Sequence, residues 1–346
     1  MTGLTSITFR QLTVEQIVEL VQQSGLDGIE WGGDVHVKPG EEALAREVGD
    51  RTRQAGLQVL SYGSYLHVDG PEHIAEDFKP VLQSALALSA PVIRVWPGGR
   101  EPDRADEAYY DRNAEALRII GEMAGQHGLT VATEYHRGTL TQNAESAQKM
   151  MQRINSPYVK TYWQPNPDIT AADNCREAAA MRPYLANVHV FCWTKGNERH
   201  PLAQGDADWR AYLQALELDP QRQHAIIEFV KDDSPARFLL NAMFLSKAGK
   251  GLIDQVYDAE TQKMLNERLH FLDGLYQQDA WKERREDCAQ VEVLFSTWGM
   301  HPFTAEELAT YFPRLKAVFY GAGSVQFFAR SCFERGVRVF SAAAAN

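Results

Sequence analysis

Three residues with metal-binding side chains stand at the carboxyl ends of short apolar segments. Glu134 lies in VATEY, His189 in NVHVF and Glu228 in AIIEF. Two carboxylates and an imidazole suit Mn, Mg, Co or Zn. Taken singly, each has a plainer interpretation, as a solvated carboxylate or a hydrogen-bonded core histidine. At equivalent ends of neighbouring strands, however, the three side chains would converge at one place.

Gln164 is a fourth candidate ligand, because it holds the equivalent position after VKTYW. Its amide oxygen can coordinate a cation but carries no charge. The two carboxylates give the set a formal charge of −2, which would neutralise one divalent ion. We therefore predict a site for one divalent cation, with manganese among the options, on Glu134, Gln164, His189 and Glu228.

The segments that carry these residues belong to a repeating pattern of helix and strand. In the first repeat, Thr13 and Gln16 have the spacing of a capping box, and apolar residues then recur at helical spacing up to Gly25. An amphipathic stretch, a polar or glycine stop and a β-rich run alternate along the chain. This alternation is typical of parallel βα units.

Eight β-rich segments favour a (β/α)8 TIM barrel over residues 1–280. A six-stranded doubly wound sheet fits less well, because the count is eight and no early strand is followed by G-x-G-x-x-G. Barrels place their active sites at the carboxyl ends of the strands, which is where the polar residues gather. The segments are ITF at 7–9, GIEW at 28–31, VLSYGSY at 59–65, VIRVW at 92–96, VATEY at 131–135, VKTYW at 159–163, VHVFCW at 188–193 and AIIEFV at 225–230.

Further side chains near these ends are candidates for binding substrate hydroxyls or oxyanions. Aromatic rings beside polar groups are common in sugar sites, although a tryptophan there can equally cover the core. His136 ranks first, because it follows Glu134 by two residues. The glycine pairs in WGGD and WPGGR match no phosphate-binding motif. The predicted substrate-binding residues are Trp31, His67, Arg94, Trp96, His136 and Lys195, with Asp34, His36 and Tyr62 as further candidates.

Charge and composition exclude some classes of partner. The chain of 346 residues has a formal charge of −11, which disfavours nucleic acid because proteins that bind it present basic patches. The apolar runs are too short for a membrane span, and the first residues lack a secretion signal. We expect a cytoplasmic protein with no membrane partner. A homo-oligomer stays open, and dimers are the commonest form. Reduced thiols are expected at Cys175, Cys192, Cys288 and Cys332.

Two longer motifs resemble the xylose isomerase-like family of sugar phosphate isomerases and epimerases. VATEYHRGTLTQNAESAQKMM resembles the family's E-x-H-x-G-T-L-T segment, and NVHV with the later PLAQGDADW resembles its histidine strand and the turn beyond. The resemblance implies a metal held by Glu, Asp, His and Glu. Glu134, His189 and Glu228 match, whereas Gln164 stands in place of the Asp. It also implies that Glu134 and Glu228 move the proton beside a substrate carbonyl.

These observations predict a metal-dependent isomerase or epimerase of a ketose, keto-polyol or sugar phosphate. Removing a proton beside a carbonyl needs a base and a positive charge near the developing enediolate. One alternative is a dehydratase or lyase on the same site, similar to inosose or dehydroshikimate dehydratases or to C-glycoside-cleaving enzymes. A non-catalytic sugar-binding protein is another. Apurinic endonucleases resemble the fold too, but they need more metal ligands than this sequence shows.

A smaller second unit is predicted at 288–346, after the charged stretch KERRED. VEVLFSTWGM, LKAVFYGAGSV and GVRVFSAAAAN resemble the amino-terminal part of the D-isomer-specific 2-hydroxyacid dehydrogenases. This resemblance implies a partial, flavodoxin-like α/β segment. GAGSVQ lacks the third glycine of a dinucleotide fingerprint. We therefore expect neither a nucleotide cofactor nor dehydrogenase activity.

Overall fold

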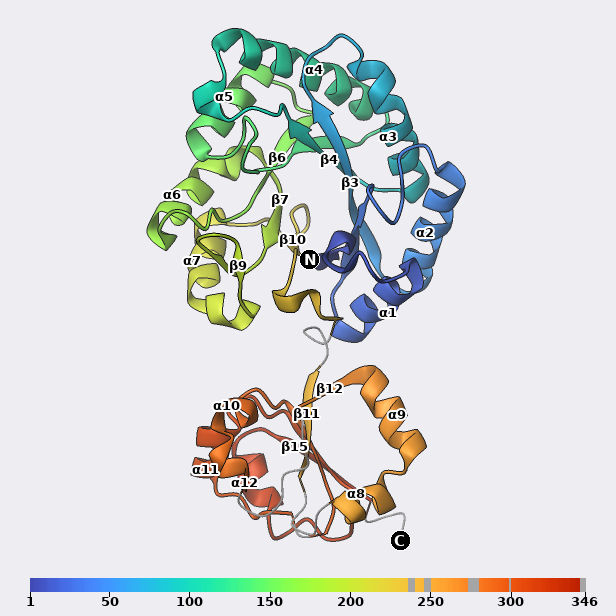
Figure 1. The fold of residues 1–346 in the computed structure, drawn as a ribbon, viewed down its shortest axis with the longest axis vertical. Helices are drawn as coiled ribbons and strands as arrows, with labels where there is room; N and C mark the ends of the chain where they lie inside the picture. Colours follow the sequence, from blue (N-terminus) through green and yellow to red (C-terminus); the bar gives the residue numbers. More distant parts are fainter. Residues whose placement is uncertain (236–239, 246–249, 273–279, 299, 343–346) are drawn as a thin grey trace. The chain divides into compact units, whose positions relative to one another are not determined.

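The computed structural model describes residues 1–235, 240–245, 250–272, 280–298 and 300–342. They form two compact units, Met1–Ser234 and Pro235–Asn346 (Figure 1). Each unit has its own parallel sheet and its own hydrophobic core. Among the helices in these ranges, none combines the length and the apolar content that crossing a membrane requires.

The first unit is a closed barrel of eight strands in the order β1-β10-β7-β6-β5-β4-β3-β2. Every neighbouring pair is parallel. The predicted TIM barrel is thereby confirmed, and the six-stranded alternative is excluded. The strands are β1 (Thr2–Thr5), β2 (Gly28–Gly32), β3 (Gln58–Val68), β4 (Val92–Pro97), β5 (Thr130–Thr133), β6 (Val159–Trp163), β7 (Leu185–Val190) and β10 (Ala225–Ile227).

Helices follow the first seven barrel strands and surround them in Figure 1. The first helix begins at the predicted capping box of Thr13 and Gln16 and ends at Gly25, whose φ of 72° suits glycine. A short hairpin of β8 (Trp193–Thr194) and β9 (Glu198–Arg199) precedes the seventh helix. The helices are α1 (Val14–Ser24), α2 (Glu42–Gln54), α3 (Ile74–Leu88), α4 (Glu107–Gly125), α5 (Ala144–Ile154), α6 (Ala171–Met181) and α7 (Asp206–Leu216).

The first strand lies earlier than predicted. ITF at 7–9 belongs to a 3-10 helix, Ser6–Phe9, whereas β1 is Thr2–Thr5. Gly3 pairs with Gly28, and a Cβ at Gly3 would come within 2.3 Å of the Leu60 side chain. Glycine therefore permits this strand to pack closely, although it is a poor strand former by propensity. The β-branched run that looked like the strand is instead the buried turn after it.

Side chains fill the barrel interior below its mouth. Five residues from different strands form one buried cluster there, so the barrel is a packed core and not a pore. They are Leu60, Ala132, Tyr162, Ala186 and Ile226.

The second unit contains a five-stranded parallel sheet in the order β12-β11-β13-β14-β15. Read along the chain, this is the 2-1-3-4-5 order of flavodoxin-like folds. A small sheet after the barrel was predicted, but from the three strands after residue 290 alone. Its strands are β11 (Leu240–Leu245), β12 (Leu269–Phe271), β13 (Val293–Ser296), β14 (Ala317–Tyr320) and β15 (Arg338–Ser341), and its helices are α8 (Lys250–Val256), α9 (Ala259–Arg268), α10 (Arg285–Cys288), α11 (Ala305–Tyr311) and α12 (Ala329–Glu334).

The boundary between the units therefore differs from the one expected between 280 and 288. β11 pairs with β12 and β13, which places 240–245 and 269–271 in the second sheet and not in the barrel. The barrel already has eight strands at Ile227 and offers no open edge to a further strand. The segment 273–279, also assigned to the barrel, lies outside the described residues.

Candidate metal and substrate site

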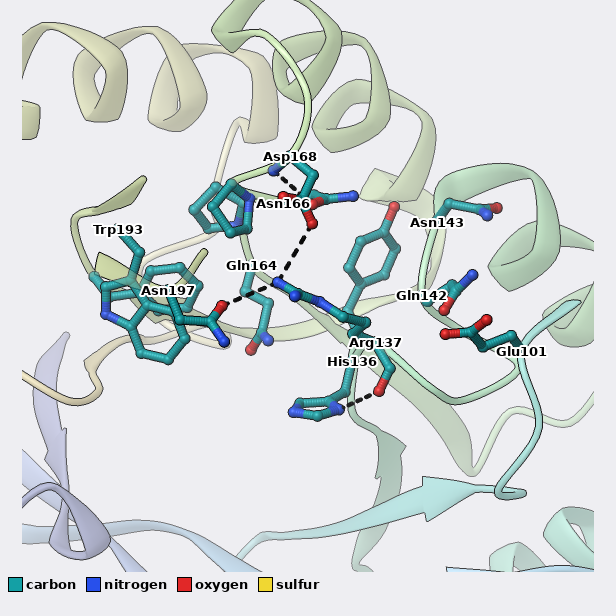
Figure 2. Close-up of a pocket in the computed structure, with 14 residues that line it drawn as sticks. Glu101, His136, Arg137, Gln142, Asn143, Gln164, Asn166, Asp168, Trp193 and Asn197 are labelled. Carbon is teal, nitrogen blue, oxygen red and sulfur yellow. Dashed lines mark hydrogen bonds and ion pairs between the residues drawn. The ribbon is translucent and has the colours of Figure 1, made fainter. Parts of the chain in front are cut away.

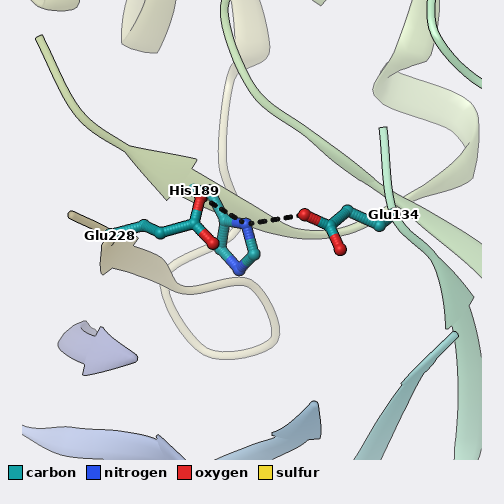
Figure 3. Close-up of side chains that lie close together, drawn as sticks. All are labelled: Glu134, His189 and Glu228. Carbon is teal, nitrogen blue, oxygen red and sulfur yellow. Dashed lines mark ion pairs between the residues drawn. The ribbon is translucent and has the colours of Figure 1, made fainter. Parts of the chain in front are cut away.

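The three predicted charged or imidazole ligands lie together at the carboxyl ends of their strands. One ligand atom from each of Glu134, His189 and Glu228 falls within 4.8 Å of the others, and all three side chains are buried. Both carboxylates lie beside the same ring nitrogen of His189, one to each side of it in Figure 3. His189 Nδ1 is 3.4 Å from Glu228 Oε2 and 3.8 Å from Glu134 Oε1.

The barrel ladder positions both carboxylates. Glu134 directly follows β5, and its amide donates to the Val95 carbonyl at 2.9 Å. Glu228 directly follows β10, and its amide donates to the Val190 carbonyl at 3.0 Å. Because these bonds continue the inter-strand pairing, the two backbones are as well held as those of the strands themselves.

Gln164 takes part in the same arrangement. Its Oε1 lies 3.1 Å from His189 Nδ1, the nitrogen that faces the carboxylates. The amide oxygen is thus within reach of the position that a cation between Glu134, His189 and Glu228 would occupy. Gln164 can serve as a neutral fourth ligand.

Glu30 is a buried residue of this site that the sequence analysis missed. Its Oε1 lies 3.2 Å from His189 Nε2, on the side of the ring away from the carboxylate pair. Its Oε2 accepts hydrogen bonds from Ser61 at 2.6 Å and from the Tyr162 hydroxyl at 2.8 Å. A carboxylate that orients the far nitrogen of a ligating histidine is a common feature of metal sites. With Nε2–H donating to Glu30, Nδ1 keeps its lone pair for a cation.

Arg94 links Glu30 to Glu134. Its Nε lies 3.2 Å from Glu30 Oε1, and its Nη1 bonds to Glu134 Oε2, as does the indole N–H of Trp96. Only 2% of the Arg94 side chain is exposed, and no partner for Nη2 lies among the described residues. The predicted residues Arg94 and Trp96 are therefore placed beside the carboxylate Glu134.

Burial and neighbouring charges shift the acid strengths of the site in opposite directions. Burial raises the pKa of Glu228, and repulsion from Glu134 and Glu30 adds to the effect. Burial also opposes ionisation of Glu134, but Arg94 and His189 outweigh it, so the pKa of Glu134 falls below its ordinary value. The pKa of Glu30 falls for the same reason, through Arg94 and His189. Two carboxylates at one site thus have pKa values pushed apart.

The formal charges of the buried groups fit a divalent cation. With His189 neutral, as an imidazole that binds a metal is, Glu30, Glu134 and Glu228 supply three negative charges and Arg94 one positive charge, all on side chains at most 5% exposed. Buried charges need partners, and the excess of two negative charges equals the charge of one divalent ion. Carboxylate, imidazole and amide oxygen are also suitable donors for such an ion. The residues present therefore fit the predicted cofactor.

Three predicted substrate-binding rings form a cluster beside Glu134. The Trp96 ring stacks on His136, with centroids 4.8 Å apart and planes 16° apart. The His67 ring meets Trp96 edge-on at 4.7 Å. His136 also faces the cavity described below. The cluster supplies a flat aromatic wall next to the carboxylate.

Two predictions for the site do not match the structure. Trp31 is fully buried, and its indole N–H donates to Thr52 of α2, so it points to the helix layer and away from the mouth. Side chains alternate along a strand, and in β2 the inward residue is Glu30. Lys195 is exposed in the β8–β9 hairpin and borders a smaller cavity, apart from the buried carboxylates.

The further candidates are also away from the carboxylates. Tyr62 donates its hydroxyl to the Val37 carbonyl, and His36 contacts the Leu12 carbonyl and the edge of Trp31. Asp34 pairs with Arg10 at the rim. These residues shape the loops after the first strands.

A cavity of about 450 Å³ opens beside the buried ligands (Figure 2). Gln164 and His136 border it and connect it with the metal ligands. This volume is in the range of small-molecule sites. The other lining residues are Glu101, Tyr135, Arg137, Gln142, Asn143, Pro165, Asn166, Pro167, Asp168, Phe191, Trp193 and Asn197.

Phe229, directly after Glu228, has an unusual backbone conformation. Its φ of 44° lies in the left-handed region, which is costly for a bulky residue. Its amide donates to Thr8, and the guanidinium carbons of Arg10 and Arg199 lie 5.4 and 4.8 Å from its ring. These contacts hold the turn that follows Glu228. A sequence pattern gives no sign of this conformation.

The family profile of the xylose isomerase-like TIM barrel matches residues 18–247. This chain belongs to that family. The profile spans most of the barrel, including the four predicted ligands, and agrees with the closed eight-stranded sheet. The resemblance of the second unit to hydroxyacid dehydrogenases is not addressed by this match.

One curated relative is an inosose dehydratase of Lactiplantibacillus plantarum, 30% identical over 150 residues, or 40% of this chain and 48% of that protein. The match thus spans about half the length of that relative.

Solved structures share the fold. A probable 3-DHS dehydratase from Bacillus anthracis superposes with a TM-score of 0.58 at 17% identity, over 69% of this chain and 96% of that one. An L-ribulose 3-epimerase gives 0.51 at 14%, over 67% and 82%. The IOLI protein with a binding zinc atom gives 0.54 at 14%, over 67% and 90%. At such identities the likeness shows the fold alone.

Proposed function

We propose that this protein is a metal-dependent enzyme that transfers a proton beside the carbonyl group of a sugar-like compound, as an isomerase or epimerase. The observation that carries this proposal is the convergence of Glu134 and Glu228 on the same ring nitrogen of His189, at a site whose charge fits one divalent cation. Epimerases and dehydratases of the same fold make carbonyl chemistry a consistent assignment.

Glu134, Gln164, His189 and Glu228 would hold the cation. When bound, the cation supplies positive charge that polarises a carbonyl and stabilises an enediolate. In an epimerase, one carboxylate removes the proton from the carbon next to the carbonyl, and the other carboxyl group, which starts protonated, donates its proton to the opposite face of that carbon. Glu30 holds the His189 ring, and Trp96 and His136 limit access of water to Glu134.

The second candidate is a dehydratase, which the curated relatives favour, since an inosose dehydratase and a 3-dehydroshikimate dehydratase both match by sequence. The first step is the same removal of a proton beside the carbonyl. The electron pair then forms a carbon–carbon double bond as the adjacent C–O bond breaks. The leaving hydroxyl takes a proton from the protonated carboxyl group and departs as water.

The test begins with metal binding and continues with proton exchange. The purified protein is stripped with a chelator, and its affinity for Mn²⁺, Co²⁺, Mg²⁺ and Zn²⁺ is measured by calorimetry. The metal-loaded protein is then incubated in D2O with D-fructose, D-allulose and an inosose, and deuterium at the carbon beside the carbonyl is followed by NMR. We expect one metal per chain and exchange in at least one compound.

Glu134→Gln and Glu228→Gln should each lower the rate of deuterium exchange by a factor of about 10² or more. Glu292→Gln, a buried carboxylate in the second unit, is the matched control and should leave exchange unchanged. Wild-type exchange that survives in both barrel variants would refute the proposal. Tight ligand binding with no exchange would identify a sugar-binding protein instead.

Mass spectrometry of the product separates the two candidates. An isomer or epimer keeps the mass of the substrate, whereas dehydration removes one water. Loss of water would select the dehydratase while leaving the metal site and the proton-transfer step intact.

A further inference from the structure

The charged side chains that line the cavity beside the candidate ligands indicate which class of substrate the site accepts. This inference rests on the proposed function. Two carboxylates, Glu101 and Asp168, and one guanidinium, Arg137, line this cavity. Arg137 is not free, because its Nη2 lies 3.5 Å from Asp168 Oδ2 and donates to the Asn197 amide oxygen at 3.1 Å (Figure 2). An incoming anion would therefore meet a wall without excess positive charge.

The other arginines around the mouth are paired in the same way. Arg10 lies 2.9 Å from Asp34, and Arg199 pairs with Asp233. Each guanidinium also lies near the ring of Phe229, so both are held in place. The positive charges of these two arginines are thus neutralised by carboxylates of other loops, Asp34 after β2 and Asp233 after β10.

Arg94 does not change this balance, although its Nη2 has no partner among the described residues. Its charge is shared between Glu30 and Glu134 in the barrel interior. A phosphate or a carboxylate would need a cation beyond those already paired.

Lys195 is the cation that borders the smaller neighbouring cavity, of about 200 Å³. Asp208 borders the same cavity, so this space too has no excess of positive charge. Both side chains are exposed to solvent, where screening weakens their pull on a distant anion.

The remaining polar lining suits hydroxyl groups. Five amide side chains border the main cavity, and their NH2 groups can donate to hydroxyl oxygens. Four of the amide oxygens already accept a hydrogen bond from the protein, so the amides are held in place and add no charge to the cavity. They are Gln142, Asn143, Gln164, Asn166 and Asn197.

We infer that the substrate is an uncharged polyhydroxylated carbonyl compound, and that Asp168 excludes phosphorylated and carboxylated analogues by neutralising Arg137. Phosphorylated sugars, which the sequence left open, and acids such as 3-dehydroshikimate are then poor ligands. Asp168 acts as a specificity-determining residue through Arg137 and does not contact the reacting atoms.

Binding experiments with matched pairs test this inference. Calorimetry on the full chain loaded with Mn²⁺ compares D-fructose with D-fructose 6-phosphate, and myo-inositol with shikimate, at low and high salt. The neutral member of each pair should bind at least about tenfold more tightly, because an added negative charge near Asp168 and Glu101 is repelled.

Asp168→Asn removes the carboxylate but keeps a similar shape, which frees Arg137. The affinity for D-fructose 6-phosphate should then rise about tenfold, with little change for D-fructose. Asp208→Asn, a carboxylate outside the main cavity, is the control and should change neither. The gain in Asp168→Asn should shrink at high salt.

Tighter binding of the anionic member by the wild type overturns the inference, and so does binding of neither member. An unchanged phosphate affinity in Asp168→Asn overturns the role of Asp168. These readouts need no turnover, so a failed deuterium exchange with preserved neutral binding refutes the proposed function alone.

Discussion

Both units of this chain are built on parallel strands connected by helices, yet they use their interiors differently. The barrel buries three carboxylates, an arginine and a histidine in one connected network. The second unit packs Trp281 against Phe303, Tyr311 and Phe312, with ring centroids 4.8–6.0 Å apart. Among the described residues, metal-binding side chains close enough to share one ion are grouped in the barrel alone.

The difference follows from closure of the sheet. In a closed barrel, the carboxyl ends of the strands surround one axis, so single polar residues from several strands converge. In an open sheet, the strand ends lie in a row and each faces a different neighbour. In the second sheet, neighbouring strands carry aromatic rings that stack in a line. Phe295 of β13, Phe319 of β14 and Phe340 of β15 form this aromatic ladder.

The largest expected effect lies in the apolar core of the second unit. Trp281→Ala should destabilise that unit by about 3–5 kcal/mol, because it leaves a large cavity among four rings. Hydrogen exchange measured by mass spectrometry should show lost protection over 280–342. Trp298→Ala, at a residue 51% exposed, should stay within about 0.5 kcal/mol. Equal losses in the two variants would contradict the assigned core.

A comparable loss of stability is expected when the polar network of the barrel loses the Arg94 guanidinium. Arg94→Met leaves Glu30 and Glu134 buried without their positively charged partner. The free energy of unfolding, measured in urea with a chelator present, should fall by about 3–5 kcal/mol. Mn²⁺ should restore part of the stability, since it replaces the missing positive charge. In Arg10→Met, where the guanidinium side chain is 41% exposed, the change should be about 1 kcal/mol or less.

Glu30→Gln tests whether the buried polar network of the barrel contributes to metal affinity, which the second unit has no group to provide among the described residues. The variant should lower Mn²⁺ affinity about 10- to 100-fold, since the His189 ring loses its orienting carboxylate. Nitrogen NMR of His189 in the Zn²⁺-loaded protein should show loss of the Nε2–H hydrogen bond to Glu30. Ser61→Ala removes a different bond to Glu30 and should have a much smaller effect. Unchanged affinity in Glu30→Gln would make Glu30 a structural residue only.

The smallest effect is expected at the edge of the aromatic ladder. Phe340 is 44% exposed and stacks on Phe319 at 4.7 Å. Phe340→Ala should therefore cost only about 0.5–1.5 kcal/mol, measured by urea unfolding. A loss as large as that of Trp281→Ala would mean that this edge belongs to a larger buried interface.

Much of the architecture could be predicted from local patterns. The capping box at Thr13, seven of the eight β-rich segments and the three strands after residue 290 depend on neighbours within a few residues. The strand ITF was wrong because a β-branched run looks the same in a strand and in a buried turn. The boundary near 280 was wrong because β11 finds its partners only in the folded sheet.

The sequence by itself determined the types of the candidate ligands, since Glu134, Gln164, His189 and Glu228 each end a recognisable strand segment. The tertiary structure decided which other side chains join them. Glu30 contacts His189 across 159 residues of sequence, and Trp31 beside it turns outward. The physical reason is that alternation along a strand puts neighbouring residues on opposite faces, and only closure of the barrel selects the face that points to the metal ligands.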